Sequence, residues 1–256
     1  MRDHGLPDGA FPAIVAHRGA SSTRPENTLA AFEEAVRLGA SLVELDVRVS
    51  RDGVAVVMHD ATVDRTTGGT GAVHELSAAE LSALEVGAGE GVPTLADTLA
   101  VLSAHAGAVL EIKNLPGEPG YDPRPAAIVE EAHAELGRTA FEGMVLVVSF
   151  NPASIAASKE IAPEVPTGLL STRHVPPRDA LAFARGAGHE MVLPGTQSLV
   201  PAGPSFVEDA HAAGVRVGTW TVDDPGLLRT LLDWGVDAVA SNDPEMALGV
   251  LARRAG

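Results

Sequence analysis

Short apolar runs rich in β-branched residues recur along the chain and alternate with longer polar-apolar segments. Near-continuous apolarity over a short run is typical of parallel strands that are covered on both faces. The runs predict eight buried strands, at residues 13–16, 42–47, 108–112, 144–149, 167–170, 191–193, 215–221 and 238–241.

The segments between these runs have the apolar spacing of amphipathic helices. In the segment 28–38, Leu29, Phe32 and Val36 fall on one helical face. Gly39 follows and suits a left-handed helix end. Several other segments begin with proline, which a first helical turn tolerates. These further predicted helices span residues 126–136, 177–186, 204–213, 225–234 and 244–251.

Alternation of strand and helix over the whole chain indicates βαβ units, and therefore an α/β protein. Eight strands in roughly 250 residues fit a (β/α)8 TIM barrel better than an open sheet. We predict a single barrel domain over residues 1–256.

One stretch breaks this rhythm, because about sixty residues separate the second and third predicted strands. That length exceeds an ordinary crossover. We therefore predict a small insertion after the second strand, at about residues 48–107. It would contain a hairpin arm at 48–60, with its turn at Asp52-Gly53, and a helix at 94–105.

The acidic balance of the chain limits its partners. Asp and Glu number 34 against 18 Lys and Arg, giving a formal net charge of -16. Nucleic-acid binding depends on neutralising phosphates with basic residues, and the sequence has no basic run, so we expect no nucleic-acid partner. We likewise expect no stable association with an anionic membrane. The sequence has no cysteine, which excludes disulfides, thiolate ligands and a cysteine nucleophile.

The sequence has no recognisable targeting segment. No long apolar run follows the first residues, as a signal peptide would require. No stretch approaches the roughly 18 apolar residues that span a bilayer. We expect a cytoplasmic protein.

Charged residues occupy the ends of the predicted strands, where barrel enzymes carry their active sites. Glu44 and Asp46 are two residues apart, so both side chains leave the same face of a strand. Glu111 and Lys113 repeat this spacing on the next barrel strand. Three converging carboxylates repel one another, and a divalent cation relieves the repulsion; oxygen ligands favour Mg²⁺ or Ca²⁺, with Mn²⁺ also compatible. The alternative is a structural ion-pair network in which Arg18 and Lys113 neutralise the acids.

Two histidines differ from the other seven in their position. His17 and His59 each end an apolar run and precede a charged residue. An imidazole near its ordinary pKa suits acid-base catalysis at neutral pH. Arg18 offers a planar guanidinium that matches phosphate oxygens. Together with a cation, these residues suit phosphodiester cleavage, although a single histidine of this kind is more often structural.

The motifs that contain these residues resemble the glycerophosphodiester phosphodiesterase family. The resemblance covers the chain from about Ile14 to Pro244. The combination is specific, whereas no single tripeptide in it would be. The matching motifs are His17-Arg18-Gly19, Pro25-Glu26-Asn27-Thr28, Glu44-Leu45-Asp46-Val47, Asp52-Gly53, His59-Asp60, residues 64–71, Glu111-Ile112-Lys113, Trp220-Thr221-Val222 and Gly235-Val236-Asp237.

The resemblance implies a TIM barrel with a small insertion and metal-dependent hydrolysis of glycerophosphodiesters to glycerol 3-phosphate and an alcohol. The implied roles are metal ligands for Glu44, Asp46 and Glu111, an acid-base pair for His17 and His59, and stabilisation of phosphoryl charge for Arg18 and Lys113. Of the two histidines, we favour His17 as base and His59 as acid.

Two aromatic residues are candidates for the wall of the substrate pocket. The resemblance implies that Trp220 packs against the glycerol or alcohol group, and Phe150 is a second candidate. Core packing is the alternative role for both. One departure from the family lies in Ser241-Asn242-Asp243-Pro244, where the family commonly has Thr-Asp before the last proline. Asn242 carries no charge there and can alter the orientation of its neighbours.

Other functions are compatible with parts of this pattern. A phospholipase D-type phosphodiesterase for lysophospholipids or sphingolipids would need an apolar docking surface or a basic rim, and neither is clear. A non-catalytic phosphodiester-binding barrel would have lost a histidine or an acid, and none is lost. A metal-dependent sugar isomerase would leave His59 and the pair Arg18 and Lys113 unexplained. We therefore predict a small-molecule glycerophosphodiester substrate, without specifying its alcohol or the number of subunits.

Overall fold

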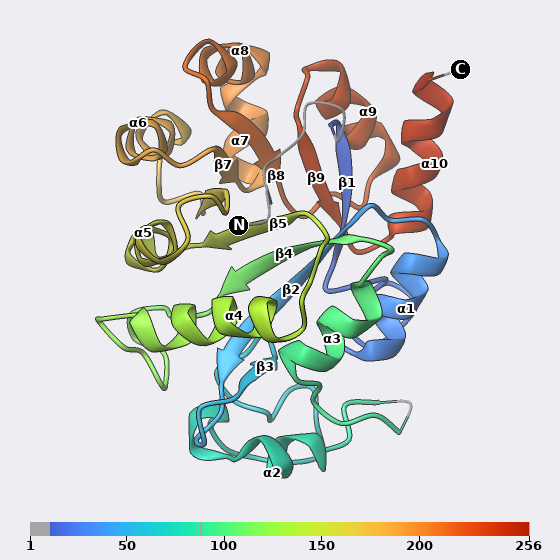
Figure 1. Ribbon diagram of the computed structural model, residues 1–256. Helices are drawn as coiled ribbons and strands as arrows, with labels where there is room; N and C mark the ends of the chain where they lie inside the picture. Colours follow the sequence, from blue (N-terminus) through green and yellow to red (C-terminus); the bar gives the residue numbers. More distant parts are fainter. Residues whose placement is uncertain (1–10, 88, 256) are drawn as a thin grey trace.

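A computed structural model describes residues 11–87 and 89–255 (Figure 1). Residues 1–10, on which the expectation of no signal peptide rests, lie outside the described residues. Eight parallel strands of the described residues close into a barrel, because β1 pairs with both β2 and β9. The predicted (β/α)8 barrel is therefore confirmed. Its strands are β1 (Ala13–His17), β2 (Leu42–Val49), β4 (Gly107–Ile112), β5 (Val145–Ser149), β6 (Thr167–Ser171), β7 (Met191–Pro194), β8 (Arg216–Thr219) and β9 (Ala238–Ser241).

Helices surround the barrel and connect its strands (Figure 1). Their starts are set locally: the side chains of Thr28, Asn151 and Asp224 each accept a hydrogen bond from a backbone N–H of the following first turn. The helices of this ring are α1 (Leu29–Arg37), α3 (Leu95–Leu102), α4 (Ala126–Arg138), α5 (Pro152–Ile161), α6 (Pro177–Ala187), α7 (Thr196–Ala202), α8 (Pro204–Ala212), α9 (Pro225–Asp233) and α10 (Pro244–Ala255).

Two helices of the ring were not predicted from the sequence. Helix α5 is rich in alanine and serine, so its apolar periodicity is weak. Helix α7 is short and contains Pro201. Within the described part of the chain, no helix combines the length and the apolarity that a membrane crossing requires.

Side-chain alternation along β2 separates the two faces of the barrel wall. Val43 and Val47 pack outward in an apolar cluster with the surrounding helices. Leu42 belongs to the separate apolar cluster inside the barrel. Glu44 and Asp46 have the same parity as Leu42, so they face the interior near the carboxyl end of the strand. The interior is thus apolar at one end and acidic at the other.

The chain between β2 and β4 adds a layer to one end of the barrel. Strand β3 (Ala55–Val57) pairs antiparallel with the end of β2, and Gly53 in the turn has a φ of +82°. The predicted hairpin is present. The short helices η2 (Val73–Glu75) and α2 (Ala78–Ser82) share a small apolar core of their own. Helix α3 contacts α1, α4, β3 and β4 and belongs to the outer apolar cluster of the barrel, as expected for a crossover helix.

Gly19 allows the turn after β1 to approach helix α1. Its φ is +79°, and a Cβ there would lie 2.6 Å from the carbonyl carbon of Ala31. Gly19→Ala is expected to lower the free energy of unfolding by roughly 2–5 kcal/mol, combining left-handed backbone strain with overpacking. Gly39→Ala is the matched control, since Gly39 has a φ of +86° but nothing within 4 Å. That variant should lose only about 1–2 kcal/mol. Equal losses in urea unfolding would contradict the packing argument.

Candidate active site

Three buried carboxylates meet at the carboxyl ends of β2 and β4. The exposed fractions of Glu44, Asp46 and Glu111 are 5%, 0% and 6%. One oxygen from each lies within 4.8 Å of the other two. The register explains this grouping, because Asp46 is the direct partner of Glu111 across the parallel pair. The structure thus brings together the three acids that the two-residue spacing singled out.

Two basic side chains reach into this cluster. Arg18 Nε lies 3.2 Å from Asp46 Oδ2, and Lys113 Nζ lies 3.1 Å from Asp46 Oδ1. Lys113 Nζ also lies 2.5 Å from Glu111 Oε1. No Lys or Arg of the described residues forms an ion pair with Glu44, whose Oε2 accepts the backbone N–H of Arg18 at 2.9 Å. Three carboxylates face two fixed positive charges, so the fully ionised cluster would retain a net negative charge.

The buried acids differ in their pKa values because their partners differ. Burial raises the pKa of Glu44 to about 8, and the neighbouring Asp46 charge acts in the same direction. Burial also raises the pKa of Glu111 to about 7, although Lys113 opposes it. For Asp46, burial acts in the same direction, but Lys113 and Arg18 outweigh it and hold the pKa below its usual range. Without a cation, Glu44 and Glu111 therefore tend to hold protons near neutral pH.

The oxygen atoms of this cluster fit a hard divalent cation. Such ions take oxygen ligands at about 2.0–2.6 Å, so oxygens on opposite sides of one ion lie up to roughly 5 Å apart. The spread of 4.8 Å is compatible with that limit. Glu44 Oε1 is buried and has no hydrogen-bond partner among the described residues. A structural ion-pair network accounts for Asp46 and Glu111 but leaves this oxygen unsatisfied, which favours the cation.

The turn after β1 aims Arg18 at the acids. Arg18 has a φ of +56°, an uncommon conformation for a residue with a side chain. In this turn its backbone N–H reaches Glu44, and its carbonyl oxygen accepts the N–H of Asn27 at 3.1 Å. The side chain of Asn27 in turn donates to Asp46 Oδ2 at 2.7 Å. The loop between β1 and α1 therefore holds both Arg18 and the acids in place.

His17 ends β1 beside this cluster. Its Nε2 lies 3.9 Å from Glu44 Oε2, and its Nδ1 lies 2.7 Å from Asn242 Oδ1. Burial lowers the pKa of His17, and the positive charge of Arg18 lowers it further. The imidazole is therefore neutral near pH 7, as a general base requires.

His59 reaches the same pocket from the added layer. Arg48 holds its backbone, because Nε and Nη2 donate to the His59 carbonyl at 3.0 and 2.6 Å. The imidazole Nδ1 lies 2.6 Å from Asp60 Oδ1. Burial lowers the pKa of His59, with Lys113 and Arg18 acting in the same direction and the Asp46 charge opposing them. The structure thus brings both predicted histidines to one pocket from different layers.

A chain of charged side chains connects the surroundings of the two histidines. Glu26 Oε1 accepts from Arg18 Nη1 at 2.9 Å and from Arg65 Nη2 at 2.6 Å. Arg65 Nε also donates to Asp60 Oδ2 at 2.6 Å. The Arg65 guanidinium, followed by the contact with His59, holds the pKa of Asp60 at about 2. Asp60 is therefore an ionised partner for His59 at neutral pH.

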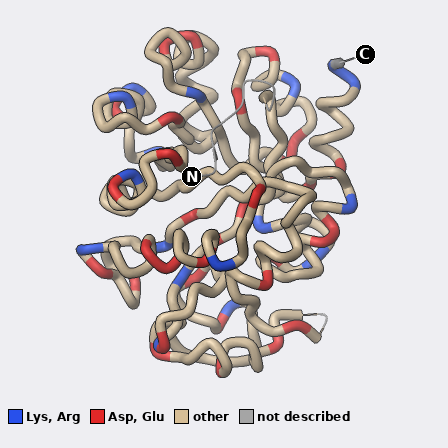
Figure 2. Tube along the Cα trace, viewed as in Figure 1, with Lys and Arg blue, Asp and Glu red and all other residues tan. Residues whose placement is uncertain are grey.

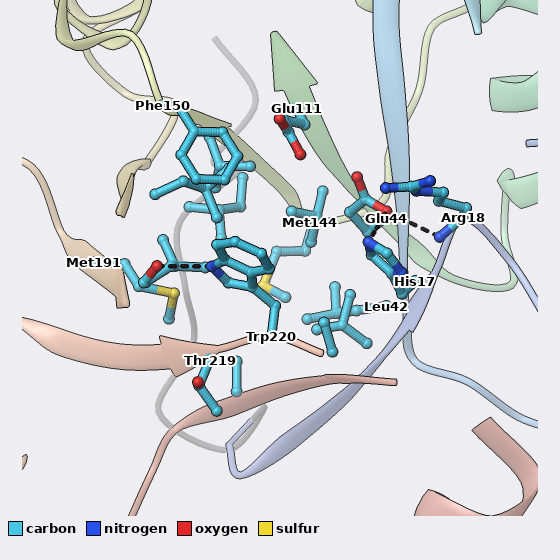
Figure 3. A pocket seen from close by; sticks show the side chains of 18 of the residues that line it. His17, Arg18, Leu42, Glu44, Glu111, Met144, Phe150, Met191, Thr219 and Trp220 are labelled. Carbon is cyan, nitrogen blue, oxygen red and sulfur yellow. Dashed lines mark hydrogen bonds and ion pairs between the residues drawn. The ribbon is translucent and has the colours of Figure 1, made fainter. Parts of the chain in front are cut away.

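Phe150 and Trp220 form an apolar wall of the pocket. Their ring centroids are 5.2 Å apart, with the planes at 87°. The Trp220 indole N–H donates to the Leu193 carbonyl at 2.9 Å. Figure 3 places the two rings across the pocket from His17 and Glu44. The cavity has a volume of about 260 Å³. Both rings also pack on the barrel interior, so pocket lining and core packing are combined in the same residues.

Residues 17–246 match the glycerophosphoryl diester phosphodiesterase family. The chain belongs to this family. It is 34% identical over 254 residues to a glycerophosphodiester phosphodiesterase of Caldanaerobacter subterraneus subsp. tengcongensis, covering 95% of this chain and 98% of the relative. It is 33% identical over 270 residues to a probable glycerophosphodiester phosphodiesterase 2 of Mycobacterium tuberculosis, covering 99% and 98%.

A solved structure supports the same assignment. The phosphodiesterase of Oleispira antarctica, in complex with the product sn-glycerol-3-phosphate, has a TM-score of 0.86 and 28% identity; the match covers 95% of this chain and 98% of that one. The family, the barrel fold and the enzyme class predicted from the sequence, a glycerophosphodiester phosphodiesterase, are therefore confirmed.

Several residues that shape this glycerophosphodiester phosphodiesterase site had no role in the sequence prediction. Glu26, Asn27 and Arg65 fell inside recognised motifs without an assigned function. The sequence did contain a sign that Arg48 has a role, because it is a charged residue inside an apolar strand. In the structure Arg48 is only 6% exposed. In Figure 2, acidic and basic positions are interspersed along the trace of the outer helices.

Proposed function

We propose that this chain hydrolyses glycerophosphodiesters to glycerol 3-phosphate and an alcohol, with a divalent cation on Glu44, Asp46 and Glu111 and with His17 and His59 as proton carriers. The observation that carries this proposal is the buried acid cluster with an unsatisfied Glu44 oxygen, next to two imidazoles in one pocket. Membership of the family supports the reaction class. The O. antarctica relative, solved with glycerol 3-phosphate as product, supports the product.

The acids and the basic residues have different electrostatic roles: the acids would bind the cation, and the basic residues would bind the phosphate. Mg²⁺, Ca²⁺ and Mn²⁺ all suit carboxylate ligands. When bound, such a cation polarises a phosphate oxygen and lowers the pKa of a nearby hydroxyl or water. Burial alone would lower the pKa of Lys113 and Arg18, but the surrounding carboxylates raise both above their usual values. Both side chains therefore stay positive and can stabilise the negative charge of the phosphate.

The partners of the two histidines favour different proton-transfer roles. His17 contacts a neutral amide through Nδ1, which leaves Nε2 free to remove a proton from water or from the neighbouring glycerol hydroxyl. His59 contacts the ionised Asp60, which opposes the lowering of the His59 pKa by burial and so favours the protonated imidazole that an acid needs. In the proposed reaction, the nucleophile bonds to phosphorus as the bond to the alcohol oxygen breaks. Attack by water gives glycerol 3-phosphate directly, whereas attack by the glycerol hydroxyl gives a cyclic phosphate that a water molecule then opens to glycerol 3-phosphate. His59 gives its proton to that oxygen.

A panel of diesters tests the proposed activity. Glycerophosphocholine, glycerophosphoethanolamine, glycerophosphoglycerol, glycerophosphoinositol and a lysophospholipid would each be incubated with Mg²⁺, Ca²⁺ or Mn²⁺. We expect glycerol 3-phosphate from at least one of the glycerophosphodiesters, no release after chelation, and recovery when the cation is restored. A preference for the lysophospholipid would support the phospholipase D-type alternative, and no hydrolysis under any of these conditions would contradict the proposal.

A further inference from the structure

Asn242 connects His17 to a carboxylate at the edge of the barrel mouth. It follows β9, and its Oδ1 lies 2.7 Å from His17 Nδ1. Its Nδ2 donates to Asp223 Oδ2 at 2.7 Å. Asp223 is exposed, Asn242 is half-buried, and the His17 side chain is 14% exposed. The contacts therefore run inward from a solvated charge, through a neutral amide, to the imidazole.

The carboxylate of Asp223 fixes the orientation of the Asn242 amide. Asp223 Oδ1 accepts the backbone N–H of Asn242 at 2.8 Å and the Ser241 hydroxyl at 2.9 Å. Asp223 Oδ2 then faces the side chain of Asn242. An ionised carboxylate only accepts hydrogen bonds, so the amide must present its NH₂ group to Asp223. The amide oxygen is consequently directed at His17. Ser21 Oγ lies 3.1 Å from this oxygen, but its single proton has the shorter contact with the His17 carbonyl oxygen, at 2.7 Å.

This orientation determines which nitrogen of His17 carries the proton. The Asn242 oxygen only accepts, so Nδ1 of His17 must be the donor. In the neutral imidazole, Nε2 then has the free lone pair. Nε2 is the nitrogen that faces the acid cluster, 3.9 Å from Glu44 Oε2. A base acting on a nucleophile near that cluster needs this tautomer.

We propose that Asp223 and Asn242 are positioning residues that hold His17 in the Nδ1–H tautomer. The role of His17 as base rests on the proposed function, whereas the tautomer does not. The pair also explains why an uncharged residue is compatible with this position. An aspartate at 242 would place a second carboxylate against Asp223, where the amide now donates.

Asp223→Asn tests this chain of hydrogen bonds without changing a residue that contacts His17 directly. The introduced amide keeps an oxygen for the backbone N–H of Asn242 and the Ser241 hydroxyl, but turns an NH₂ group toward the Asn242 side chain. Asn242 then rotates its amide to accept, and presents NH₂ to His17, which moves the imidazole proton to Nε2. We expect kcat to fall about 10–100-fold, the range typical of residues that orient a functional group. KM should change by less than about threefold, since no substrate contact is lost.

The exchange variant Asp223→Asn/Asn242→Asp restores every hydrogen bond with donor and acceptor reversed between the two positions. We expect it to recover kcat to within about fivefold of the wild type. Asn242→Asp alone should be impaired, because it leaves two facing carboxylates. Asp224→Asn is the matched control: the side chain of the neighbouring Asp224 accepts the Leu227 N–H and caps α9, and asparagine caps a helix equally well. Its kcat should equal that of the wild type.

The tautomer itself is measured by ¹⁵N NMR of the Mg²⁺-loaded protein at about pH 8, where histidine is neutral. We expect protonated Nδ1 in the wild type and the exchange variant, and protonated Nε2 in Asp223→Asn. A wild-type His17 protonated on Nε2, or an exchange variant as slow as Asp223→Asn, would overturn the inference. If a variant fails to fold, the wild-type spectrum still decides. An unchanged kcat in His17→Ala would instead refute the catalytic role of His17 and leave the tautomer assignment intact.

Discussion

His17→Ala and His59→Ala are each expected to lower kcat about 10³-fold, the middle of the range for loss of a general acid or base. The two losses should differ in their dependence on the leaving group. A diester that releases p-nitrophenolate needs little protonation of the departing oxygen, so His59→Ala should recover most of its activity on that substrate. His17→Ala should stay slow on both substrates, because the nucleophile still has to lose its proton. Steady-state kinetics with a natural and an activated diester measure this difference.

His105→Ala is the control for these variants. His105 is exposed and lies just before β4, at the end of the barrel opposite the acid cluster. Its kcat should equal that of the wild type. Full activity in either His17→Ala or His59→Ala would refute the acid-base pair, and equal recovery of both on the activated diester would refute the division of roles.

Removal of the cation is expected to abolish activity and to make stability depend on pH. The folded-state pKa values of Glu44 and Glu111, about 8 and about 7, lie above the ordinary value of 4.5. The folded metal-free protein therefore binds more protons than the unfolded chain across this interval. The stabilisation is fully present below about pH 4.5 and is lost as the pH rises through 7 and 8. Asp46 has the opposite sign, but its pKa lies below 3.8 and outside this interval.

A bound cation replaces these protons, so its stabilising effect should increase with pH. At one fixed Mg²⁺ concentration, a hundredfold above the Kd at pH 8, we expect Tm to rise by roughly 5–10 °C at pH 8, and by clearly less at pH 5, where protons compete with the cation. Differential scanning calorimetry with chelator or with Mg²⁺ measures the increment. Glu44→Gln/Glu111→Gln removes both titrating groups, and its Tm should respond to neither Mg²⁺ nor this part of the pH range. An increment of equal size at pH 5 and pH 8 would contradict the assignment.

The charged residues at the strand ends could be predicted as site residues. The prediction needs only their local spacing and the rule that barrel enzymes carry their active sites at the carboxyl ends of the strands. Glu44 and Asp46 share a face through the two-residue period of a strand, and parallel register places Glu111 beside them. His17 follows from its place at the end of an apolar run. Each of these predictions follows from spacing and strand order alone, without knowledge of any side-chain contact.

The support around these residues could not be predicted, since it depends on where the added layer lies. Arg48 reaches the His59 backbone only because the hairpin folds β3 back along β2. The contacts of Glu26 with Arg65 join segments that are 39 residues apart. Side chains at such separations carry no mutual pattern, so only the three-dimensional structure shows that they form one network.

His59 belongs to the layer between β2 and β4, so activity depends on the folding of that layer as well as on the folding of the barrel. That layer has its own small apolar core, including Val56, Val63 and Leu81, which is separate from the barrel interior. In the proposed mechanism, the barrel supplies the cation ligands and the base, while the layer supplies the proton for the leaving alcohol. Local opening of the layer would thus leave an intact barrel that holds a cation and a phosphodiester but cannot release the alcohol. If His59 has the proposed role, we expect activity to be lost on opening of the layer before the barrel itself unfolds.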